Sequence, residues 1–349
     1  MKKERIAWVD LIRVSAVLCV IMLHTFDHAN LKLMPTMTSL EFEFYQIIRM
    51  IGRVAVPLFL MISGHLIINK AATEEPLRFY KKRVPQFILI IIAYTVINNY
   101  LISIAIHKEL NISLVLSNLL NGNTGLAYPL WYMFVITGIY LFAPFIGRMV
   151  KACSDRDLKV YLSLAVILCF IPSTLNTLFH VNSPFGMIAN SYGSEYVIYF
   201  ITGYYLAKSK DVEAISTRTL IASFVFITIL VVMLQFHLWR QDKQSYAEGI
   251  TWYNSIFIYI QSCVIFAIAM KCDKRIGKSA RKILSSLGKG SFFTYLIHLS
   301  FLDLILFSGV IHSSYKYLNL SVMIVMTYTI CMVVFFALSR FRLMSILIK

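Results

Sequence analysis

Residues 8–28, which read WVDLIRVSAVLCVIMLHTFDH, decide the fold. This run has about the 20 residues that a helix needs to cross the roughly 30 Å hydrocarbon core of a membrane. Asp10, Arg13 and His24 lie within it. Because the segment carries such groups and lacks a small-residue cleavage site, we predict a retained membrane helix rather than a secretory signal.

The whole chain has the composition of a membrane protein. Of its 349 residues, 58% are hydrophobic and only 14% are charged. Soluble domains average about 45 to 50% apolar and about 25% charged residues. The 25 Phe and 20 Tyr exclude a disordered chain. We predict a single all-α domain over residues 1–349, with its six cysteines reduced and with no bound metal.

Ten segments are long and apolar enough to span a bilayer as helices. They run roughly over residues 8–28, 46–69, 84–106, 128–147, 160–180, 192–207, 219–239, 252–270, 291–311 and 318–339. We therefore predict a polytopic bundle of about ten transmembrane helices embedded in membrane lipid.

The distribution of basic residues orients the chain. With the N-terminus in the cytoplasm, 25 of the 33 Lys and Arg fall in inner loops, 5 in outer loops and 3 within spans. Cytoplasmic loops are enriched in these residues, so we predict that both termini are cytoplasmic. The net charge of +16 is then mainly a topological signal rather than a sign of nucleic-acid binding. A basic inner surface would also attract a polyanionic cofactor.

The first span carries a stripe of polar groups. Arg13 and His24 are eleven residues apart, which places them on one face of a helix and about 16.5 Å apart along its axis. Asp10 lies one turn before Arg13, at ion-pair spacing. One interpretation is an interfacial ion pair and a histidine bonded to a neighbouring helix. The other is that His24, with Asp27 nearby, acts as a general base.

Two arginines of the second span, Arg49 and Arg53, lie at about the depth of His24. Asp27, Glu41 or Glu43 could neutralise them structurally. Alternatively, they could stabilise an oxyanion or hold an acidic sugar or a phosphate. Pro57, four residues after Arg53, predicts a weakened helix at this point.

Later spans add weaker candidates. Trp131 and Tyr132 lie at an outer span end, where an aromatic belt is the default interpretation. Glu195 is expected at the outer mouth of the sixth span. His298 is expected roughly 10 Å in from the cytoplasmic end of the ninth, as a buried or a functional histidine.

Five segments, in this order, resemble the acyltransferase family 3 integral-membrane enzymes. They are WVDLIRVSAVLCVIMLH (8–24), GRVAVPLFLMISG (52–64), PLWYMFVITGIYLFAPFI (129–146), YFITGYYLA (199–207) and GSFFTYLIHLSFL (290–302). The resemblance covers nearly the whole chain. Its compact form is most similar to the subgroup that includes the O-acetyltransferase of enterobacterial common antigen.

This resemblance implies an enzyme of the bacterial inner membrane. It would move an acetyl group from cytoplasmic acetyl-CoA to a hydroxyl of a cell-surface or lipid-linked glycan. By the resemblance, His24 is the catalytic histidine, Arg13 its companion, and Arg53 the arginine before the VPLF segment. The sequence leaves open direct transfer and an acyl-histidine intermediate.

Further residues are expected to assist these three. We expect Arg13, Lys81, Lys82 and Arg83 to bind the donor phosphates. The residues expected to support the site or to bind substrate are Asp10, Asp27, Arg49, Trp131, Tyr132, Glu195 and His298.

A secondary transporter or flippase for a polysaccharide precursor or small molecule is the alternative. Proton coupling in such a protein could use His24, Asp303 and Glu195. The ordered motifs favour the acyltransferase, because a transporter has no reason to carry them. A purely structural or sensory protein is disfavoured by the five ionisable groups within spans.

Overall fold

The computed structural model describes residues 5–33, 38–179, 194–241, 248–309, 316–341 and 347, and every regular element within them is a helix. The predicted all-α fold is therefore confirmed. The helices are α1 (Ala7–Leu33), α2 (Ser39–Arg53), α3 (Ala55–Thr73), α4 (Pro76–Ala105), α5 (Ile112–Leu120), η2 (Gly125–Leu130), α6 (Trp131–Ala152), α7 (Asp155–Ala165), η3 (Val166–Phe170), α8 (Ile171–Phe179), α10 (Glu195–Leu206), α11 (Lys210–Ala214), α12 (Thr217–Arg240), α14 (Ile256–Cys272), η4 (Asp273–Arg275), α15 (Lys278–Phe307) and α16 (Lys316–Leu338).

Within the described ranges, nine helical segments are long and apolar enough to cross a membrane. Their outer faces are apolar: on α12, Ile221, Phe226 and Met233 are 50%, 67% and 64% exposed. Such a surface suits lipid rather than water. This count agrees with the prediction of about ten, and of the predicted segments, the one at 192–207 forms the described helix α10, which has 12 residues. The polytopic bundle itself is confirmed.

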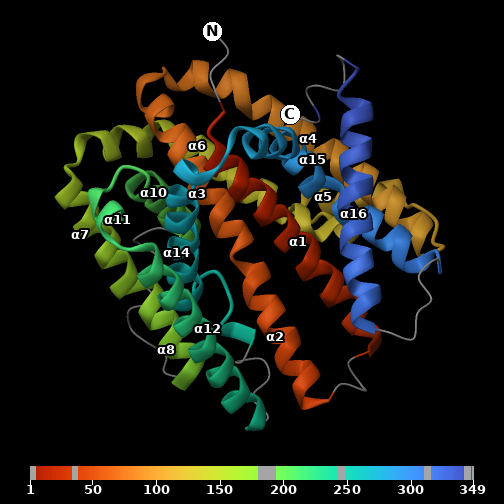
Figure 1. Cartoon of the computed structure of the whole chain (residues 1–349). Helices are drawn as coiled ribbons and strands as arrows, with labels where there is room; N and C mark the ends of the chain where they lie inside the picture. The colour runs from red at the N-terminus through yellow and green to blue at the C-terminus, as the bar shows by residue number, and fades with distance from the viewer. Residues whose placement is uncertain are drawn as a thin grey trace.

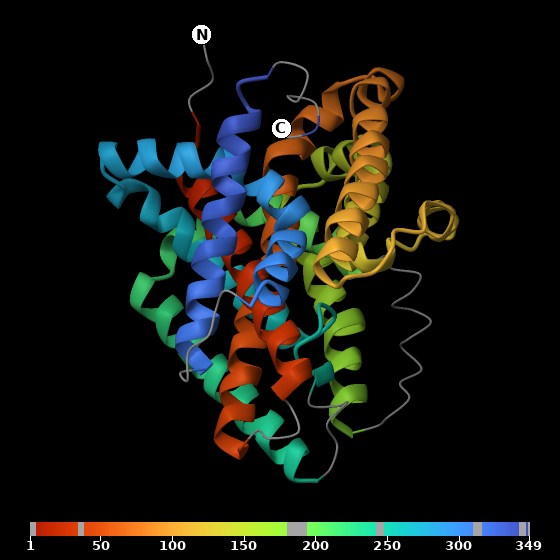
Figure 2. The ribbon, with the colours of Figure 1, turned by 90° about the vertical axis from the view of Figure 1, so that its right-hand side faces the viewer.

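The start of α1 and the end of α16 lie at the same end of the bundle (Figures 1 and 2). From there α1 runs through the bundle toward the end where α2 begins. It contacts α2, α3, α14, α15 and α16, so its polar stripe faces other helices.

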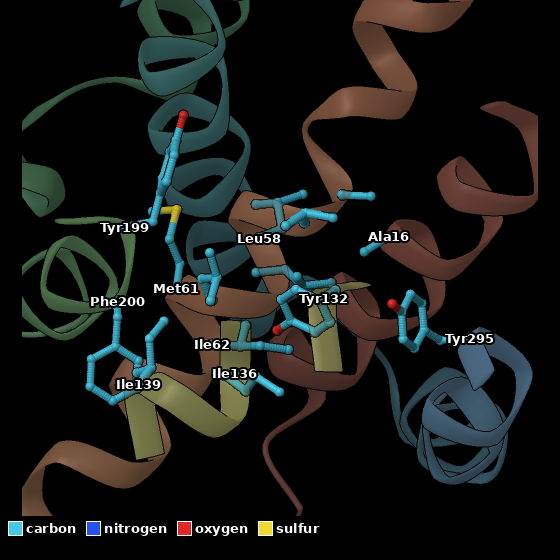
Figure 3. Close-up of a cluster of buried hydrophobic side chains, with 14 of the residues drawn as sticks. Ala16, Leu58, Met61, Ile62, Tyr132, Ile136, Ile139, Tyr199, Phe200 and Tyr295 are labelled. Atoms are coloured by element: carbon cyan, nitrogen blue, oxygen red, sulfur yellow. The ribbon is translucent and has the colours of Figure 1, made fainter. Parts of the chain in front are cut away.

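Helix α3 lies at the centre of the largest hydrophobic cluster. Its side chains share this cluster with those of α6 and α10, with Ala16 of α1 and with Tyr295 of α15 (Figure 3). Two glycines bring α3 and α10 unusually close. A Cβ added at Gly64 would lie 1.7 Å from the carbonyl oxygen of Phe200, and one added at Gly203 would lie 2.1 Å from that of Met61. Small residues of this kind allow the close backbone approach of membrane helices.

The second predicted span is broken where Pro57 predicts a weakened helix. Helix α2 ends at Arg53, and α3 begins at Ala55 after a turn residue, Val54. Pro57 has no N–H to donate to the carbonyl of Arg53, and its ring would clash with that carbonyl in a continuous helix. The break therefore places Arg53 at a helix end.

Candidate active site

Three histidines and a tyrosine gather where α1, α15 and η2 meet. His24 and His28 lie one turn apart on α1, and the hydroxyl of Tyr128 is 2.8 Å from Nδ1 of His24 and 3.2 Å from Nε2 of His28. Nδ1 of His28 lies 2.8 Å from Oδ1 of Asp303. The ring of His298 stacks on that of His24 with 5.2 Å between centroids. The imidazole of His24 thus faces the interior of the bundle.

The short helix η2, which carries Tyr128, is held by α4. The side-chain amide of Asn99 donates to the carbonyl of Thr124 at 2.8 Å and accepts from the backbone N–H of Leu126 at 3.0 Å. Gly125 has φ +60°, and a Cβ there would lie 2.8 Å from Oδ1 of Asn99. Only glycine fits this turn without strain. The local chain therefore fixes the position of Tyr128.

His298 has one defined partner and one free ring nitrogen. Its Nδ1 lies 2.7 Å from the carbonyl oxygen of Tyr295, so Nδ1 carries the hydrogen and donates it. Its Nε2 therefore holds a lone pair, and this atom is buried without a hydrogen-bond partner among the described residues. A buried polar atom without a partner calls for an explanation. One explanation is that Nε2 of His298 accepts a hydrogen bond from a bound substrate.

Arg53 lies beside the histidine cluster with its charge unneutralised. Its guanidinium carbon stands 4.2 Å from the ring centroid of Trp252 and 5.6 Å from that of Tyr253. Among the described residues, no carboxylate lies within ion-pair distance of Arg53, yet it is close enough to His24 for its charge to act on that ring. The ring of Tyr253 in turn lies 5.6 Å from that of Trp131 and 6.2 Å from that of Tyr196, so these four rings form one aromatic group that includes the neighbours of Arg53.

Arg49, by contrast, is neutralised. Its Nη1 lies 3.0 Å from Oε1 of Glu248, and its Nε lies 3.7 Å from Oδ1 of Asp27. Asp27 also accepts a hydrogen bond of 2.7 Å from the Tyr45 hydroxyl. The predicted partner Asp27 is thus confirmed, and Glu248 is added. Arg49 joins α2 to α1 and to the segment before α14.

A basic cavity of about 860 Å³ lies at the end of the bundle where α1 begins, away from the histidine cluster. Arg5, Arg13, Arg83 and Lys289 line it. The predicted ion pair is present: Nη1 of Arg13 donates to Oδ1 of buried Asp10 at 3.0 Å, and Arg5 pairs with the same carboxylate. The single carboxylate of Asp10 orients the guanidiniums of Arg5 and Arg13. The cavity surface therefore keeps a net positive charge, which suits the binding of phosphate groups.

Aromatic rings also line this basic cavity. Phe59, Tyr132 and Tyr295 line it, with the rings of Tyr132 and Tyr295 5.5 Å apart in an edge-to-face pair (Figure 3). On its other side, the Tyr295 ring lies 6.1 Å from that of His298, which stacks on His24. We call these three rings the aromatic wall. Of the three, Tyr295 both lines the cavity and approaches the histidine cluster.

The comparison with protein families agrees with this arrangement. Residues 6–340 match a family model described as an acyltransferase domain. The chain belongs to acyltransferase family 3. Comparison of this acyltransferase with curated proteins gave no match, and comparison with solved structures gave none either.

Two of the four residues predicted to hold the donor line the basic cavity of the acyltransferase. Arg13 and Arg83 do so. Arg83 also pairs with Glu74 at 3.4 Å. Lys81 and Lys82 are exposed and are not among the described lining residues.

His298 lies at the depth of His24, unlike its predicted position near the cytoplasmic end of a span. The reason is the length of its helix. Helix α15 begins at Lys278 rather than at residue 291, so His298 lies about 30 Å along it.

The remaining predicted residues are spread around these two sites. Tyr132 belongs to the aromatic wall, whereas Trp131 packs on Tyr196 and Tyr253 beyond it. Glu195 begins α10 next to Tyr196, and it has no ion pair within the described ranges. Across the same residues, no group of three or more His, Cys, Asp or Glu side chains is placed to hold a metal ion.

Sequence reasoning missed several members of the site. Asp303 is only a weak candidate in the sequence, as a charged residue of a later span, and its pairing with His28 has no signal there. Tyr128 has the appearance of an ordinary aromatic residue at a helix boundary. Lys289 and Arg5 could be counted as inner basic residues, but their place in one cavity depends on the packing of α1 against α15.

Proposed function

We propose that this membrane acyltransferase is an O-acetyltransferase of the bacterial inner membrane, of the enterobacterial common antigen type. It moves an acetyl group from cytoplasmic acetyl-CoA to a hydroxyl of a cell-surface or lipid-linked glycan. The observation that carries the proposal is the placement of a basic cavity and a histidine cluster on two sides of one aromatic wall. Both termini are cytoplasmic in this orientation, so the cavity opens inward.

The basic cavity suits the donor by size and charge. Its volume of about 860 Å³ lies in the range of small-molecule sites, about 300 to 1,000 Å³. The phosphates of acetyl-CoA can bind the planar guanidinium groups of Arg13 and Arg83 and the ammonium group of Lys289. The exposed Lys81 and Lys82, next to Arg83 in sequence, add attraction at longer range. The pantetheine arm then extends between the rings of the aromatic wall, so that the thioester reaches His24 on the far side.

His24 acts as the general base on the far side of the wall. It removes the proton from the acceptor hydroxyl as the oxygen attacks the thioester carbonyl. The new C–O bond forms, the C–S bond breaks, and the departing thiolate takes the proton from His24. This direct route needs no covalent enzyme intermediate. The unneutralised guanidinium of Arg53 stabilises the oxyanion, and Nε2 of His298 accepts a hydrogen bond from a substrate.

The acceptor approaches through the aromatic group around Arg53. Trp131, Tyr196 and Tyr253 present ring faces within 6.2 Å of one another. Such rings offer an apolar face with a polar edge, which suits the C–H face and hydroxyl edge of a sugar. In this proposal Glu195, the first residue of α10, binds further hydroxyls.

The test is transfer of label from acetyl-CoA. Purified protein is incubated with acetyl-labelled acetyl-CoA and a panel of lipid-linked and free glycans. We expect label in a glycan, and its loss in His24→Ala by about 10²- to 10⁴-fold, the usual contribution of a positioned general base. His237→Ala, which removes an exposed imidazole at the end of α12, is the matched control and should retain transfer.

Two results would contradict the proposal. Full transfer by His24→Ala would remove the proposed base. Movement of an unmodified saccharide across reconstituted vesicles, without consumption of acetyl-CoA, would favour the transporter alternative.

A further inference from the structure

Four side chains form an unbroken line of hydrogen-bond contacts that ends at His24. Oδ1 of Asp303 lies 2.8 Å from Nδ1 of His28, and Nε2 of His28 lies 3.2 Å from the Tyr128 hydroxyl. That hydroxyl lies 2.8 Å from Nδ1 of His24. Asp303 is 3% exposed, so the line starts at a buried carboxylate.

The chemistry of these groups gives the line a direction. An ionised carboxylate only accepts, so Nδ1 of His28 carries a hydrogen and donates it to Asp303. In a neutral imidazole the other nitrogen is then an acceptor, so Nε2 of His28 accepts the single proton of Tyr128. The Tyr128 oxygen in turn accepts from Nδ1 of His24. The Nε2 atom of His24 is left with its lone pair.

We propose that Asp303, His28 and Tyr128 are positioning residues that hold His24 in the tautomer whose Nε2 accepts the substrate proton. The proposal rests on the proposed function in that His24 is the base. None of the three needs to touch a substrate, because each acts through the next.

This line of hydrogen bonds stabilises the positive charge that forms on His24, and no proton moves along it. When Nε2 of His24 takes the hydroxyl proton, the imidazolium keeps its Nδ1 hydrogen and its bond to Tyr128. The two bonds beyond stay in place, and the carboxylate of Asp303 remains the negative end of the line. In serine proteases, a buried aspartate has the same two effects on its histidine, holding the tautomer and stabilising the imidazolium.

The opposite direction is a defined alternative. It requires either hydrogens on both nitrogens of His28 or a protonated Asp303 that donates to Nδ1 of His28. In both cases Nε2 of His28 donates to Tyr128, and Tyr128 donates to Nδ1 of His24. The hydrogen of neutral His24 then lies on Nε2, and that atom is no longer a base. The charged and titratable groups that face this line are His298 from α15, Arg53 and Tyr45 from α2, and Asp27 from α1.

The test reads the tautomer directly. The protein is labelled with ¹⁵N-histidine, and the His24 signals are identified by their loss in His24→Gln. Nitrogen chemical shifts separate protonated from unprotonated ring nitrogens. We expect a protonated Nδ1 and an unprotonated Nε2 in the unaltered protein, and a mixture of the two tautomers in Tyr128→Phe. Tyr80→Phe, which loses a hydroxyl bonded 2.7 Å from the Leu141 carbonyl oxygen, is the matched control.

Kinetics gives the second measurement. Tyr128→Phe should lower kcat, by up to about 10⁴-fold, the loss that a reversed histidine tautomer causes in a serine protease. The KM for acetyl-CoA should stay unchanged, because Tyr128 is not among the described residues that line the basic cavity. Asp303→Asn should shift the His24 tautomer in the same direction, since its amide can donate to His28 and reverse the line.

The outcomes separate this inference from the proposed function. A protonated Nε2 on His24 in the unaltered protein would overturn the positioning role of these residues. The same would follow if neither Tyr128→Phe nor Asp303→Asn changed the tautomer of His24. If these variants shift the tautomer but no transfer is detected in any sample, the positioning role stands and the proposed function fails.

Discussion

Replacing Gly64 or Gly203 by alanine should disrupt the contact on which the centre of the bundle depends. Both glycines lie in the interface between α3 and α10, and each faces a backbone carbonyl of the other helix. A carbonyl held in a helical hydrogen bond cannot swing away as a side chain can. The helices themselves must therefore separate.

The size of this separation follows from the distances. An ordinary contact of a Cβ begins at 3.4 Å, whereas the added atom would lie 1.7 Å from the oxygen of Phe200 in Gly64→Ala and 2.1 Å from that of Met61 in Gly203→Ala. Helix α3 would have to move by up to about 1.7 Å, which is far beyond the adjustments of a packed interior. Overpacking costs about 1 to 3 kcal/mol where side chains can adjust, and we expect at least the upper value here.

Thermal unfolding of the detergent-solubilised protein, with size-exclusion chromatography, measures the effect. We expect both variants to unfold at lower temperature and to lose transfer activity, because α3 also carries Phe59 of the aromatic wall. Gly138→Ala is the matched control, since a Cβ at Gly138 of α6 meets nothing within 4 Å. If Gly64→Ala proves as stable as Gly138→Ala, the close approach of α3 and α10 is refuted.

Two further predictions concern the arginines on the two sides of the wall. Arg13→Gln should raise the KM for acetyl-CoA by about 10- to 100-fold, because it removes one charge-assisted bond to a phosphate, with a smaller effect on kcat; an unchanged KM in steady-state assays would exclude Arg13 from the donor site. Arg53→Gln should instead lower kcat by about 10² to 10³, as loss of an oxyanion donor does, with the KM for acetyl-CoA unchanged. Arg53→Lys, which keeps the charge, should recover part of the loss, and equal kcat values for all three proteins would contradict the assigned role.

The sequence was sufficient for those parts of the fold that depend on local chemistry. Length and hydropathy predicted the spans, and the spacing of Asp10 and Arg13 along one helix predicted their ion pair. Pro57 predicted the break that ends α2 at Arg53. Each of these features follows from residues within one or two turns of each other.

Features that depend on packing were not accessible in this way. The salt bridge between Arg49 and Glu248 joins residues 199 positions apart, and the second of them lies outside any predicted span. The predicted depth of His298 was wrong because α15 begins at Lys278, well before the predicted span start at residue 291. The contacts of Tyr128 depend on a turn that Asn99 and Gly125 hold in place, and hydropathy carries no information on such a turn.

The aromatic wall has a consequence for the energy supply of the cell. A water-filled opening on one side and a line of proton-binding groups on the other would, if joined, let protons leak down their electrochemical gradient. In the proposed orientation, the rings of Phe59, Tyr132 and Tyr295 are the seal against that leak. In the proposed function these rings admit the narrow pantetheine arm and fill the space around it, so that an acetyl group reaches His24 while the gradient is kept.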